Sequence, residues 1–580
     1  MKVHGTPALW CWIVSAIMSV PDGRRPSAAA EDGTHSAETL NSFDIVIAGG
    51  SVAALAAGLA AAESGCRVAL LEPTDWIGGQ LTSSGVPAVD ECWHQVLDPA
   101  TKSVLFSASE IARDPRNMTP GFRDMFTRIG NPGRGWVSRY CFEPAHLLAR
   151  ELYPQTQRVA NRLTIFHETV PKRVETDREQ RRIRAVIAIQ RRARTNLPWN
   201  GYDRLPSEDL RDWYQDRDSD RFHKSVLTFQ GGKSTVFIDA TEWGEILALS
   251  DAPFLQGVEQ VDGEPTGDDT IGQCTAFTFV QRFAAFPGDE LSITTSDDHF
   301  GFGMYHDKPD AWSRIWTYRR IRGSRSEPTP GDLCLQNWGY DATQGEGGND
   351  YPFGYLFLDR RRTAAQRSNW CGGIDATVLA AAEKRALGWH VWFKQHAPSG
   401  VDPGQILLDR GVLGTGHGLA KLPYIRDTRR SIGLDGFILK VADLTADPRQ
   451  QVARKFPDRI AIGCYAVDIH ALADRKYPAY VTELPQTLPF HIPFRALTNS
   501  AYDNLLVAGK TMAQSFMANS ATRLHPIEWS TGTAAGIAAA RMATEGLTSR
   551  QVLATVSQLQ SLVRSKTPID WTIDEPLATK

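Results

Sequence analysis

The clearest hydrophobic pattern in the chain is an apolar run at residues 43–48 that shows no strict alternation of polar and apolar positions. A short run of this kind, rich in β-branched residues, is typical of a parallel strand buried on both faces. An alanine-rich stretch from about Ser51 to Ser64 then predicts a helix that Gly65 terminates. A second apolar run at 67–71 ends on Glu72. The pattern predicts one strand–helix–strand unit of about 30 residues.

Later apolar runs predict more strands of the same sheet. The runs at 235–241 and 504–508 resemble the first, and the stretches 163–190 and 225–241 also read as strands. The sheet is therefore expected to come from separated parts of the chain. Residues 191–223 are charged and aromatic with few aliphatic positions, and we interpret them as a surface insertion.

The middle of the chain has a different hydrophobic periodicity. Residues 256–490 contain alternating, aromatic-rich segments such as 275–280, one helical stretch around 374–395, and many glycine and proline turns. This pattern favours a mainly antiparallel second domain. Residues 491–550 are expected to return to the first domain, and residues 551–580 to form a C-terminal tail.

The N-terminus reads as a targeting segment. An apolar run at 8–20 is too short to span a bilayer, and Ala28–Ala30 fits a cleavage site. Arg24-Arg25 follows the run, whereas a twin-arginine signal precedes it. We expect residues 1–30 to be a signal peptide and 31–42 a linker. Export to the periplasm or outside the cell is the prediction, and a cytoplasmic location is the alternative.

Composition narrows the function classes. The chain has 580 residues, too many for one ordinary core, so two or more structural units are expected. A formal net charge of -3 disfavours nucleic acid and anionic membranes as partners.

No later stretch is apolar for long enough to predict a stable membrane span in the mature chain. No C-x-x-C occurs, so neither a redox dithiol nor a metal or iron–sulfur site is predicted.

The turn after the first strand fits a dinucleotide. Gly49 and Gly50 are followed by small residues, Ser51 and Ala54, at the other two positions of a G-x-G-x-x-G pattern. Small side chains let the backbone approach a pyrophosphate, which the helix N-terminus then stabilises. Glu72 ends the second strand, where a carboxylate accepts hydrogen bonds from ribose hydroxyls. The motif alone does not decide between FAD and NAD.

The wider sequence resembles the FAD-dependent oxidoreductase family that also contains the flavin part of heterodisulfide reductase. The resembling stretches run in family order from residue 43 to 545: FDIVIAGGSVAALAAGLAAA (43–62), LLEPTDWIGGQLTSSGVPAVDE (70–91), PYIRDTRR (423–430), GCYAVDIH (463–470), IPFRALTNSAYDNLLVAGK (492–510) and ATRLHPIEWSTGTAAG (521–536). The family's iron–sulfur cysteine clusters are absent from this sequence, which puts cluster-mediated electron transfer in doubt.

This resemblance implies an α/β fold with noncovalently bound FAD. A Rossmann-like FAD-binding domain over 43–255, completed by 491–550, would carry a mainly antiparallel α+β substrate domain at 256–490. The glycine turn would contact the pyrophosphate, and Glu72 would contact the adenosine ribose. The loop that follows would lie along the cofactor. The closing segment brings a helix beginning near Trp529 to the isoalloxazine end. The implied FAD contacts are Gly49, Gly50, Ser51, Ala54, Glu72, Gly78, Gly79, Gln80, Gly509 and Trp529.

His525 and Glu528, which precede the helix expected near Trp529, are candidates for chemistry at the flavin. We hypothesise that His525 is a general acid or base and that Glu528 tunes or orients it. The alternative is that His525 only hydrogen-bonds the cofactor or a loop backbone. The small residues at 532–536 suit either close approach to the flavin or tight helix packing.

Two further groups of polar residues are weaker candidates. Arg426, Arg429 and Arg430 would share one face if they lay on a helix, and could grip a carboxylate; a structural salt-bridge cluster is the alternative. Asp468 and His470 lie two residues apart, so on a strand they would share a face. They would form either an orienting carboxylate–imidazole pair or a structural hydrogen bond.

The leading functional hypothesis is an FAD-dependent oxidase or dehydrogenase. Hydride would pass from a small organic substrate to the flavin, and an electron acceptor, oxygen or another, would reoxidise it. Two alternatives stay open: a flavin reductase fed by NAD(P)H, and a flavin-carrying electron-transfer or binding protein without small-molecule turnover. No second glycine-rich turn follows a strand, which counts against a nicotinamide domain.

Overall fold

The computed structural model describes residues 38–90, 96–97, 104–106, 118–261, 264–288, 311–337, 349–445, 453–470, 472–473 and 487–571. The predicted signal peptide at 1–30 lies outside these ranges. Within them, no helix combines the length and the apolar character needed to cross a bilayer.

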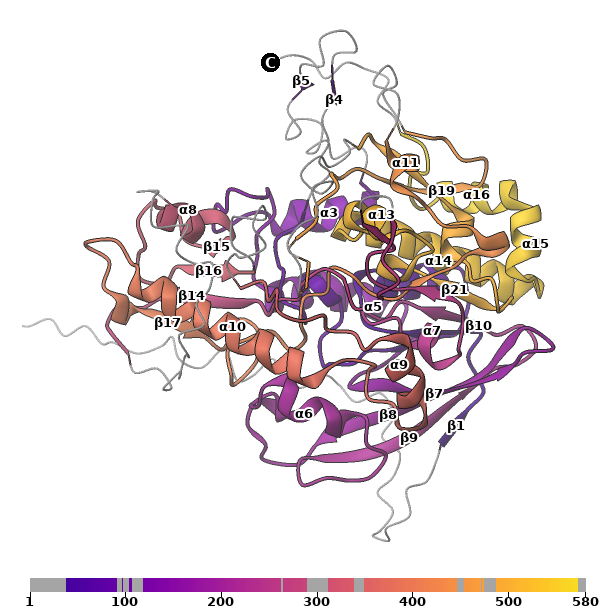
Figure 1. The fold of residues 1–580 in the computed structure, drawn as a ribbon, viewed down its shortest axis with the longest axis horizontal. Coiled ribbons are helices and arrows are strands. Elements are labelled where there is room, and N and C mark those ends of the chain that lie inside the picture. The colour runs from indigo at the N-terminus through magenta and orange to yellow at the C-terminus, as the bar shows by residue number, and fades with distance from the viewer. Residues whose placement is uncertain are drawn as a thin grey trace, which may run out of the picture. The chain divides into compact units, whose positions relative to one another are not determined.

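A parallel five-stranded sheet forms the centre of the α/β domain (Figure 1). Its strand order is β21-β10-β2-β3-β6, and every neighbouring pair is parallel. The strands are β2 (Ile45–Ala48), β3 (Val68–Leu71), β6 (Leu163–Phe166), β10 (Val236–Asp239) and β21 (Leu505–Val507). Their residues are buried, as the apolar runs predicted, except for Thr164, Ile165 and Phe166 of the edge strand β6. The sheet is assembled from separated parts of the chain, which confirms that prediction.

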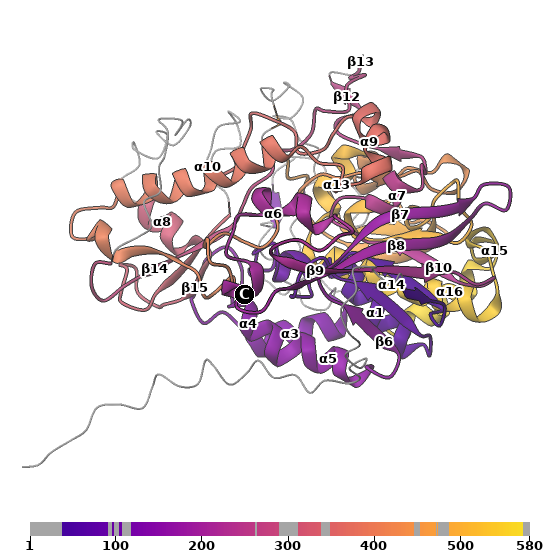
Figure 2. The ribbon, with the colours of Figure 1, turned by 90° about the horizontal axis from the view of Figure 1, so that it is seen from below.

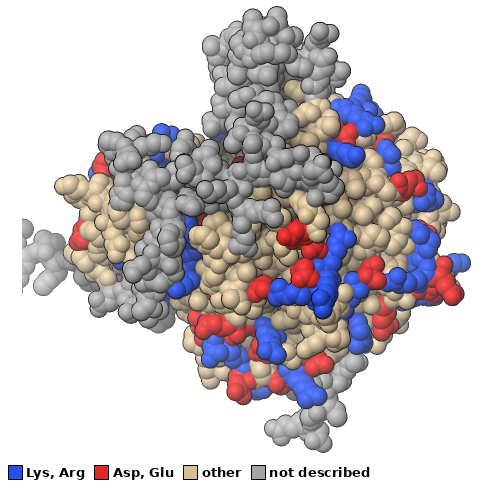
Figure 3. Space-filling view, in the orientation of Figure 1, with Lys and Arg blue, Asp and Glu red and all other residues tan. Residues whose placement is uncertain are grey.

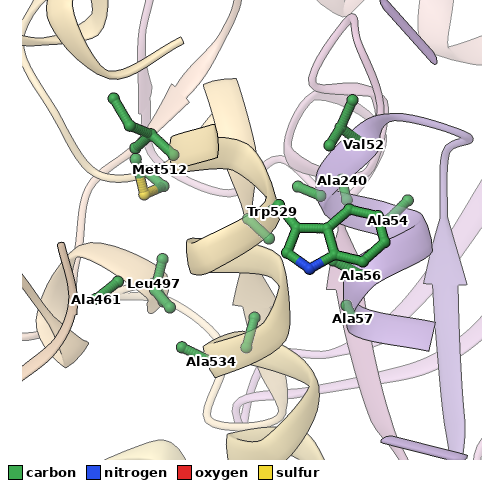
Figure 4. Close-up of a cluster of buried hydrophobic side chains, with 14 of the residues drawn as sticks. Val52, Ala54, Ala56, Ala57, Ala240, Ala461, Leu497, Met512, Trp529 and Ala534 are labelled. Atoms are coloured by element: carbon green, nitrogen blue, oxygen red, sulfur yellow. The ribbon is translucent and has the colours of Figure 1, made fainter. Parts of the chain in front are cut away.

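Two helices rich in small residues pack together against this sheet. They are α1 (Val52–Glu63) and α14 (His525–Glu545). A Cβ atom added at Gly532 would lie 2.2 Å from the Ala53 carbonyl oxygen, and one at Gly536 would lie 2.3 Å from that of Ala57. These contacts show that the 532–536 stretch serves tight helix packing. Figure 4 shows the Trp529 ring of α14 lying against the alanines of α1.

A second sheet, of order β1-β9-β8-β7, stands beside the first. Its strands are β1 (Glu38–Leu40), β7 (Thr169–Asp177), β8 (Arg182–Ala193) and β9 (Phe222–Gln230). The segment 191–223, predicted to be a surface insertion, connects β8 to β9 and contains α6 (Pro206–Trp213). Tyr202, Trp213, Tyr214 and Phe222 of this segment are buried in the same core as the second sheet, whereas Trp199 is exposed, so the segment is only partly at the surface. Buried aromatic rings thus supply much of the apolar contact that aliphatic residues provide elsewhere.

The middle of the chain forms a separate antiparallel sheet of order β15-β16-β14-β17. Its strands are β14 (Phe279–Phe283), β15 (Arg320–Arg322), β16 (Leu333–Gln336) and β17 (Ile406–Asp409). The long helix α10 (Ala376–Gln395) runs beside it (Figures 1 and 2). The antiparallel character predicted from alternation is confirmed.

Two boundaries differ from the sequence-based division. The strand β19 (Arg459–Gly463) falls within the expected substrate block but packs against α14 and pairs with β20 (Phe490–Pro493). Helices α15 (Ser549–Ala554) and α16 (Val556–Arg564) form part of the expected tail, and α16 also packs on α14. Their apolar side chains therefore complete the core around α14 instead of trailing from it.

The remaining described elements are short and connect these layers. They are α3 (Pro120–Ile129), α4 (Pro144–Leu147), α5 (Tyr153–Arg158), α7 (Glu245–Leu249), α8 (Ala311–Tyr318), α9 (Arg360–Gln366), α11 (Val441–Leu444), α13 (Phe516–Thr522), β4 (Val96–Leu97), β5 (Val104–Phe106), β11 (Phe254–Leu255), β12 (Gln260–Val261), β13 (Glu264–Pro265) and β18 (Arg430–Ser431). On the face shown in Figure 3, acidic and basic side chains are interspersed, with no large field of one sign.

Candidate functional site

The turn between β2 and α1 brings backbone unusually close to its neighbours. Gly49 has a φ of +106°, and a Cβ atom there would lie 2.3 Å from the Ala240 carbonyl oxygen. At Gly50 a Cβ atom would lie 1.7 Å from Glu72 Oε2. Only glycine fits at position 49, because the clash is with backbone and L residues rarely adopt positive φ; at position 50 a side chain would have to displace the Glu72 carboxyl group. The turn thus has the open backbone that a pyrophosphate requires.

Ser51 replaces a glycine of the usual pattern and has a structural role of its own. Its Oγ accepts a hydrogen bond from the Ala54 amide (3.1 Å) and donates one to the Ala240 carbonyl (2.8 Å). Ser51 is therefore the N-cap of α1 and also ties the helix to the end of β10. Ala54, inside the first turn of α1, is fully buried.

Glu72 offers an acceptor beside this turn. The residue follows β3 and is fully buried; its Oε1 accepts hydrogen bonds from the amide and hydroxyl of Thr74, both at 2.8 Å. Its Oε2 has no hydrogen-bond partner among the described residues. Burial raises the pKa of Glu72 to about 8, although the bonds from Thr74 oppose the shift. A buried carboxylate oxygen without a partner fits a ribose hydroxyl, so the residues present fit a dinucleotide.

The loop at 78–80 covers the turn from the other side. Gly78 and Gly79 both have positive φ, and the Gly78 amide donates to the Gly50 carbonyl (3.2 Å). A Cβ atom at Gly79 would lie 2.7 Å from the Ser51 Cα. The Gln80 side-chain amide donates to the Arg523 carbonyl (3.2 Å), which links this loop to the segment before α14.

A cavity runs along these residues. Gly49, Gly50, Glu72, Gly79 and Glu242 are among those that line it. Its empty space is about 470 Å³, a volume that includes open solvent at the mouth. The cavity lies where parallel strands of the central sheet end, which is where α/β folds bind their ligands.

A buried charge cluster stands at the same edge of the sheet. Lys510 follows β21, and its Nζ lies 2.5 Å from Glu242 Oε2 and 3.1 Å from Glu528 Oε1. Gly509, with a φ of +69°, lets the chain pass close to α1, since a Cβ atom there would lie 2.9 Å from that of Ala53. Sequence reasoning missed Lys510 and Glu242. Each lies just beyond an apolar run predicted as a strand, and this shared position was the available signal.

The cluster holds two carboxylates with one cation. Burial raises the pKa of Glu528 to about 7, and the charge of Glu242 acts in the same direction, while Lys510 opposes it. For Lys510, burial is outweighed by the two carboxylates, which raise its pKa above the ordinary value. Near neutral pH the cluster can therefore exchange a proton at Glu528 while Lys510 keeps its charge.

His525 begins α14 and is fully buried. The Asp90 amide donates to its Nδ1 (3.2 Å), which puts the proton of the neutral ring on Nε2. Burial lowers the pKa of His525 to about 4, helped by the charges of Arg319 and Lys510 and opposed by Asp90. The imidazole is neutral at pH 7, so burial works against the predicted proton exchange near neutral pH. No interaction found between described residues joins His525 to Glu528, which pairs with Lys510 instead.

Arg429 and Arg430 do not share a helix face. Residues 423–429 form no helix, and Arg430 opens β18. Arg429 donates to the carbonyls of Trp243 (2.8 Å) and Gly373 (2.6 Å), and burial lowers its pKa to about 10. Arg430 pairs with Asp427 and with Glu259 (2.8 Å). Both guanidinium groups thus bind protein acceptors, which favours the structural alternative.

Arg426 instead belongs to a second buried cluster, with His470. Its Nη2 lies 2.9 Å from Asp350 Oδ1, while His470 Nδ1 lies 2.7 Å from Asp350 Oδ2. His470 Nε2 lies 3.5 Å from Asp468 Oδ2, which also accepts from Arg523 (3.0 Å). Although burial opposes it, the charges of His470 and Arg523 lower the pKa of Asp468. The predicted Asp468–His470 pair forms, although in irregular backbone and not on a strand.

Trp529 lies inside α14 and not at its start. Helix α14 begins at His525, and Trp529 lies one turn further along. Its ring centroid is 5.4 Å from that of Phe122, and the side chain packs in the core between α14 and α1 (Figure 4). Residues other than Trp529 line the cavity described above.

Several solved structures match the chain at low identity and low TM-score. Thermovibrio ammonificans THI4 is 16% identical at a TM-score of 0.22, covering 38% of this chain and 66% of its own, just under two thirds. The apo Mycobacterium smegmatis Sdh1 complex is 13% identical at a TM-score of 0.30, covering 90% and 76%. A geranylgeranyl bacteriochlorophyll reductase-like protein from Thermoplasma acidophilum is 9% identical at a TM-score of 0.28, covering 92% and 85%. No curated protein matches the chain.

A family model gives the decisive comparison. The model of FAD dependent oxidoreductases matches residues 44–198 and 219–563, which include every element of the central sheet, the glycine turn and α14. The match agrees with the glycine turn and the partnerless Glu72 oxygen found in the structure. The chain belongs to the family of FAD-dependent oxidoreductases.

Proposed function

We propose that the protein oxidises a small organic substrate by hydride transfer to noncovalently bound FAD, with electrons passing on to oxygen or another acceptor. The observation that carries this proposal is the buried cluster of Glu242, Lys510 and Glu528 beside the dinucleotide turn. Burying three ionisable groups is costly, and such clusters with shifted pKa values concentrate at catalytic sites.

The chain holds the cofactor with the residues of the cavity. The N-terminus of α1, with its open glycine turn, receives the pyrophosphate, and Glu72 receives the adenosine ribose. The loop at 78–80 and Gly509 border the path of the cofactor. When bound, FAD supplies the redox chemistry, as acceptor of hydride from the substrate and donor of electrons to the final acceptor.

The protein's own groups then manage charge and protons. Lys510 Nζ keeps a positive charge at the edge of the sheet, where it stabilises negative charge that develops during reduction. The Glu528 carboxyl, with a pKa of about 7, can hold or release the proton that accompanies the hydride. His525, neutral with its proton on Nε2, serves as a hydrogen-bonding group at the start of α14.

The second buried cluster is where we place substrate binding. Arg426 Nε and Arg523 Nε are buried donors without a hydrogen-bond partner among the described residues. Arg523 also donates to the Tyr424 hydroxyl (2.8 Å) and is tied to the cofactor loop through Gln80. Unused guanidinium donors favour a substrate that carries a carboxylate or carbonyl oxygen.

The test is an anaerobic absorbance measurement on the purified protein with amines, hydroxy acids and sugars. The proposal expects one compound class to bleach the flavin band, and oxygen or an added acceptor to restore it. Rapid bleaching by NADH or NADPH alone would point to the flavin-reductase alternative. Reversible photoreduction without response to any compound would point to an electron carrier. A His525→Ala protein that keeps FAD and full turnover would remove His525 from the chemistry.

We also propose that the protein is exported after removal of residues 1–30. The apolar run at 8–20 and the small residues at Ala28–Ala30 support this proposal. Mass spectrometry of the protein from fractionated cells tests it. A mature N-terminus near residue 31 in the exported fraction is the expected result, and an intact N-terminus confined to the cytoplasm would contradict it.

A further inference from the structure

One part of the cofactor cavity comes from outside the family pattern. The family model matches residues 44–198 and 219–563, so residues 199–218 have no counterpart in it. This unmatched segment contains α6 and the residue that follows it, Tyr214. Trp213, the last residue of α6, and Tyr214 both line the cavity described above, and they are only 3% and 1% exposed. A segment outside the family match therefore contributes two residues to the lining of the cavity.

Three aromatic side chains line the same cavity as Glu72. They are Trp213, Tyr214 and Trp243, and Val170 is also part of the lining. The glycine turn contacts Glu72 directly, since a Cβ atom at Gly50 would collide with the Glu72 carboxyl group. The cavity thus presents, in one continuous lining, a phosphate-binding turn, a ribose-binding carboxylate and an aromatic wall.

Two donors in this wall lack acceptors. The indole Nε1 atoms of Trp213 and Trp243 are buried, and neither has a hydrogen-bond partner among the described residues. The Tyr214 hydroxyl, by contrast, donates to Glu245 Oε1 (2.7 Å) and is satisfied. A buried indole N–H usually finds an acceptor, so two such groups in the lining of one cavity indicate a ligand that supplies acceptors.

The ring of Trp213 is held firmly in place. The Arg191 guanidinium lies over it, 3.8 Å from the ring centroid, and donates to the Tyr202 hydroxyl (3.1 Å). Tyr202 packs edge-on against Trp213 at 6.2 Å. The unmatched segment is therefore anchored to β8 by buried contacts, which gives Trp213 a fixed orientation at low entropic cost.

We propose that Trp213, at the end of α6, and Trp243 form the adenosine end of the FAD site and recognise the adenine base. Adenine is flat, so aromatic rings pack on it, and its ring nitrogens are acceptors for indole N–H groups. The cavity thus combines a turn for the phosphates, Glu72 for the ribose and aromatic rings for the base of an adenosine diphosphate. This inference rests on FAD binding in the proposed function, but not on any substrate.

Binding of ADP to the full-length apoprotein, measured by calorimetry, tests the proposal. Trp213→Ala is expected to weaken ADP and FAD binding by roughly 5- to 150-fold, as loss of one base–aromatic contact predicts. Trp213→Phe, which keeps a ring but loses the N–H, is expected to fall between Trp213→Ala and the wild type. The matched control is Trp199→Ala, because Trp199 belongs to the same segment but is 42% exposed. That control should bind ADP as the wild type does.

Wild-type ADP affinity in both Trp213 variants would overturn the proposal. If Trp213→Ala does not fold, Trp213→Phe and Trp243→Phe decide, because both preserve most of the buried volume; unchanged ADP affinity in both contradicts the inference. Thermal unfolding of each variant identifies the folded ones. A different result would contradict the proposed function. A protein that binds ADP through Trp213 but whose flavin responds to no substrate would refute substrate oxidation and leave the adenine site supported.

Discussion

The substitution Gly50→Ala tests the geometry of the dinucleotide turn most directly. The added Cβ would lie 1.7 Å from Glu72 Oε2, 2.3 Å from its Cδ and 2.7 Å from its Oε1. The Glu72 carboxyl must therefore swing away by more than an ångström, which breaks its hydrogen bonds from Thr74. Overpacking with lost hydrogen bonds is expected to lower the free energy of unfolding by about 1–3 kcal/mol.

The same displacement should weaken cofactor binding. Glu72 Oε2 is the acceptor we assign to the adenosine ribose, and a hydrogen bond to an uncharged group contributes ~0.5–1.5 kcal/mol. The dissociation constant for FAD is then expected to rise by roughly 2- to 13-fold. Titration of the apoprotein with FAD, followed by flavin fluorescence, measures this change, and chemical denaturation measures stability.

A matched control separates the turn from a general glycine effect. Gly121 lies near the start of α3, and a Cβ atom added there would meet nothing within 4 Å. Gly121→Ala should therefore stabilise the protein by about 0.5–1 kcal/mol and leave FAD affinity unchanged. If Gly50→Ala binds FAD with wild-type affinity, the assignment of the turn and of Glu72 to the cofactor is refuted.

Three further changes probe other parts of the site. Ser51→Ala removes the cap of α1 and should cost about 1 kcal/mol of unfolding free energy, measured by denaturation; an unchanged value would contradict the capping role. Lys510→Met leaves Glu242 and Glu528 without their cation and should lower the free energy of unfolding by about 3–5 kcal/mol. The control Lys455→Met changes a largely exposed lysine and should lower it far less in the same denaturation assay. His525 has a pKa of about 4 in the folded protein and an ordinary pKa of 6.5 when unfolded. The unfolded chain therefore takes up the proton first, so the free energy of unfolding is highest above pH 6.5 and falls as the pH drops toward 4. His525→Asn should flatten the stability profile in that window, and an unaltered slope would show that other groups cause it.

The local pattern of the sequence determined the first strand–helix–strand unit and indicated that it binds a dinucleotide. Buried parallel strands need apolar residues at every position, and a close backbone turn needs glycine, so both leave marks within a few neighbouring residues. Gly49, Gly50 and Glu72 accordingly lie where the motif predicted. The resemblance over the rest of the chain extended that motif to FAD, and the family match agrees.

Only the tertiary structure decided which distant residues meet. Lys510 and Glu242 are far apart in the sequence and become partners because β21 and β10 are neighbouring parallel strands whose ends coincide. Burial, which no local pattern measures, makes His525 neutral at pH 7 and turns Arg429 toward backbone carbonyls. For the same reason Trp213, in a segment that reads as surface, belongs to the cavity wall. Which side chains form ion pairs and which become buried depends on contacts between segments that are distant in the sequence. These contacts exist only in the folded chain.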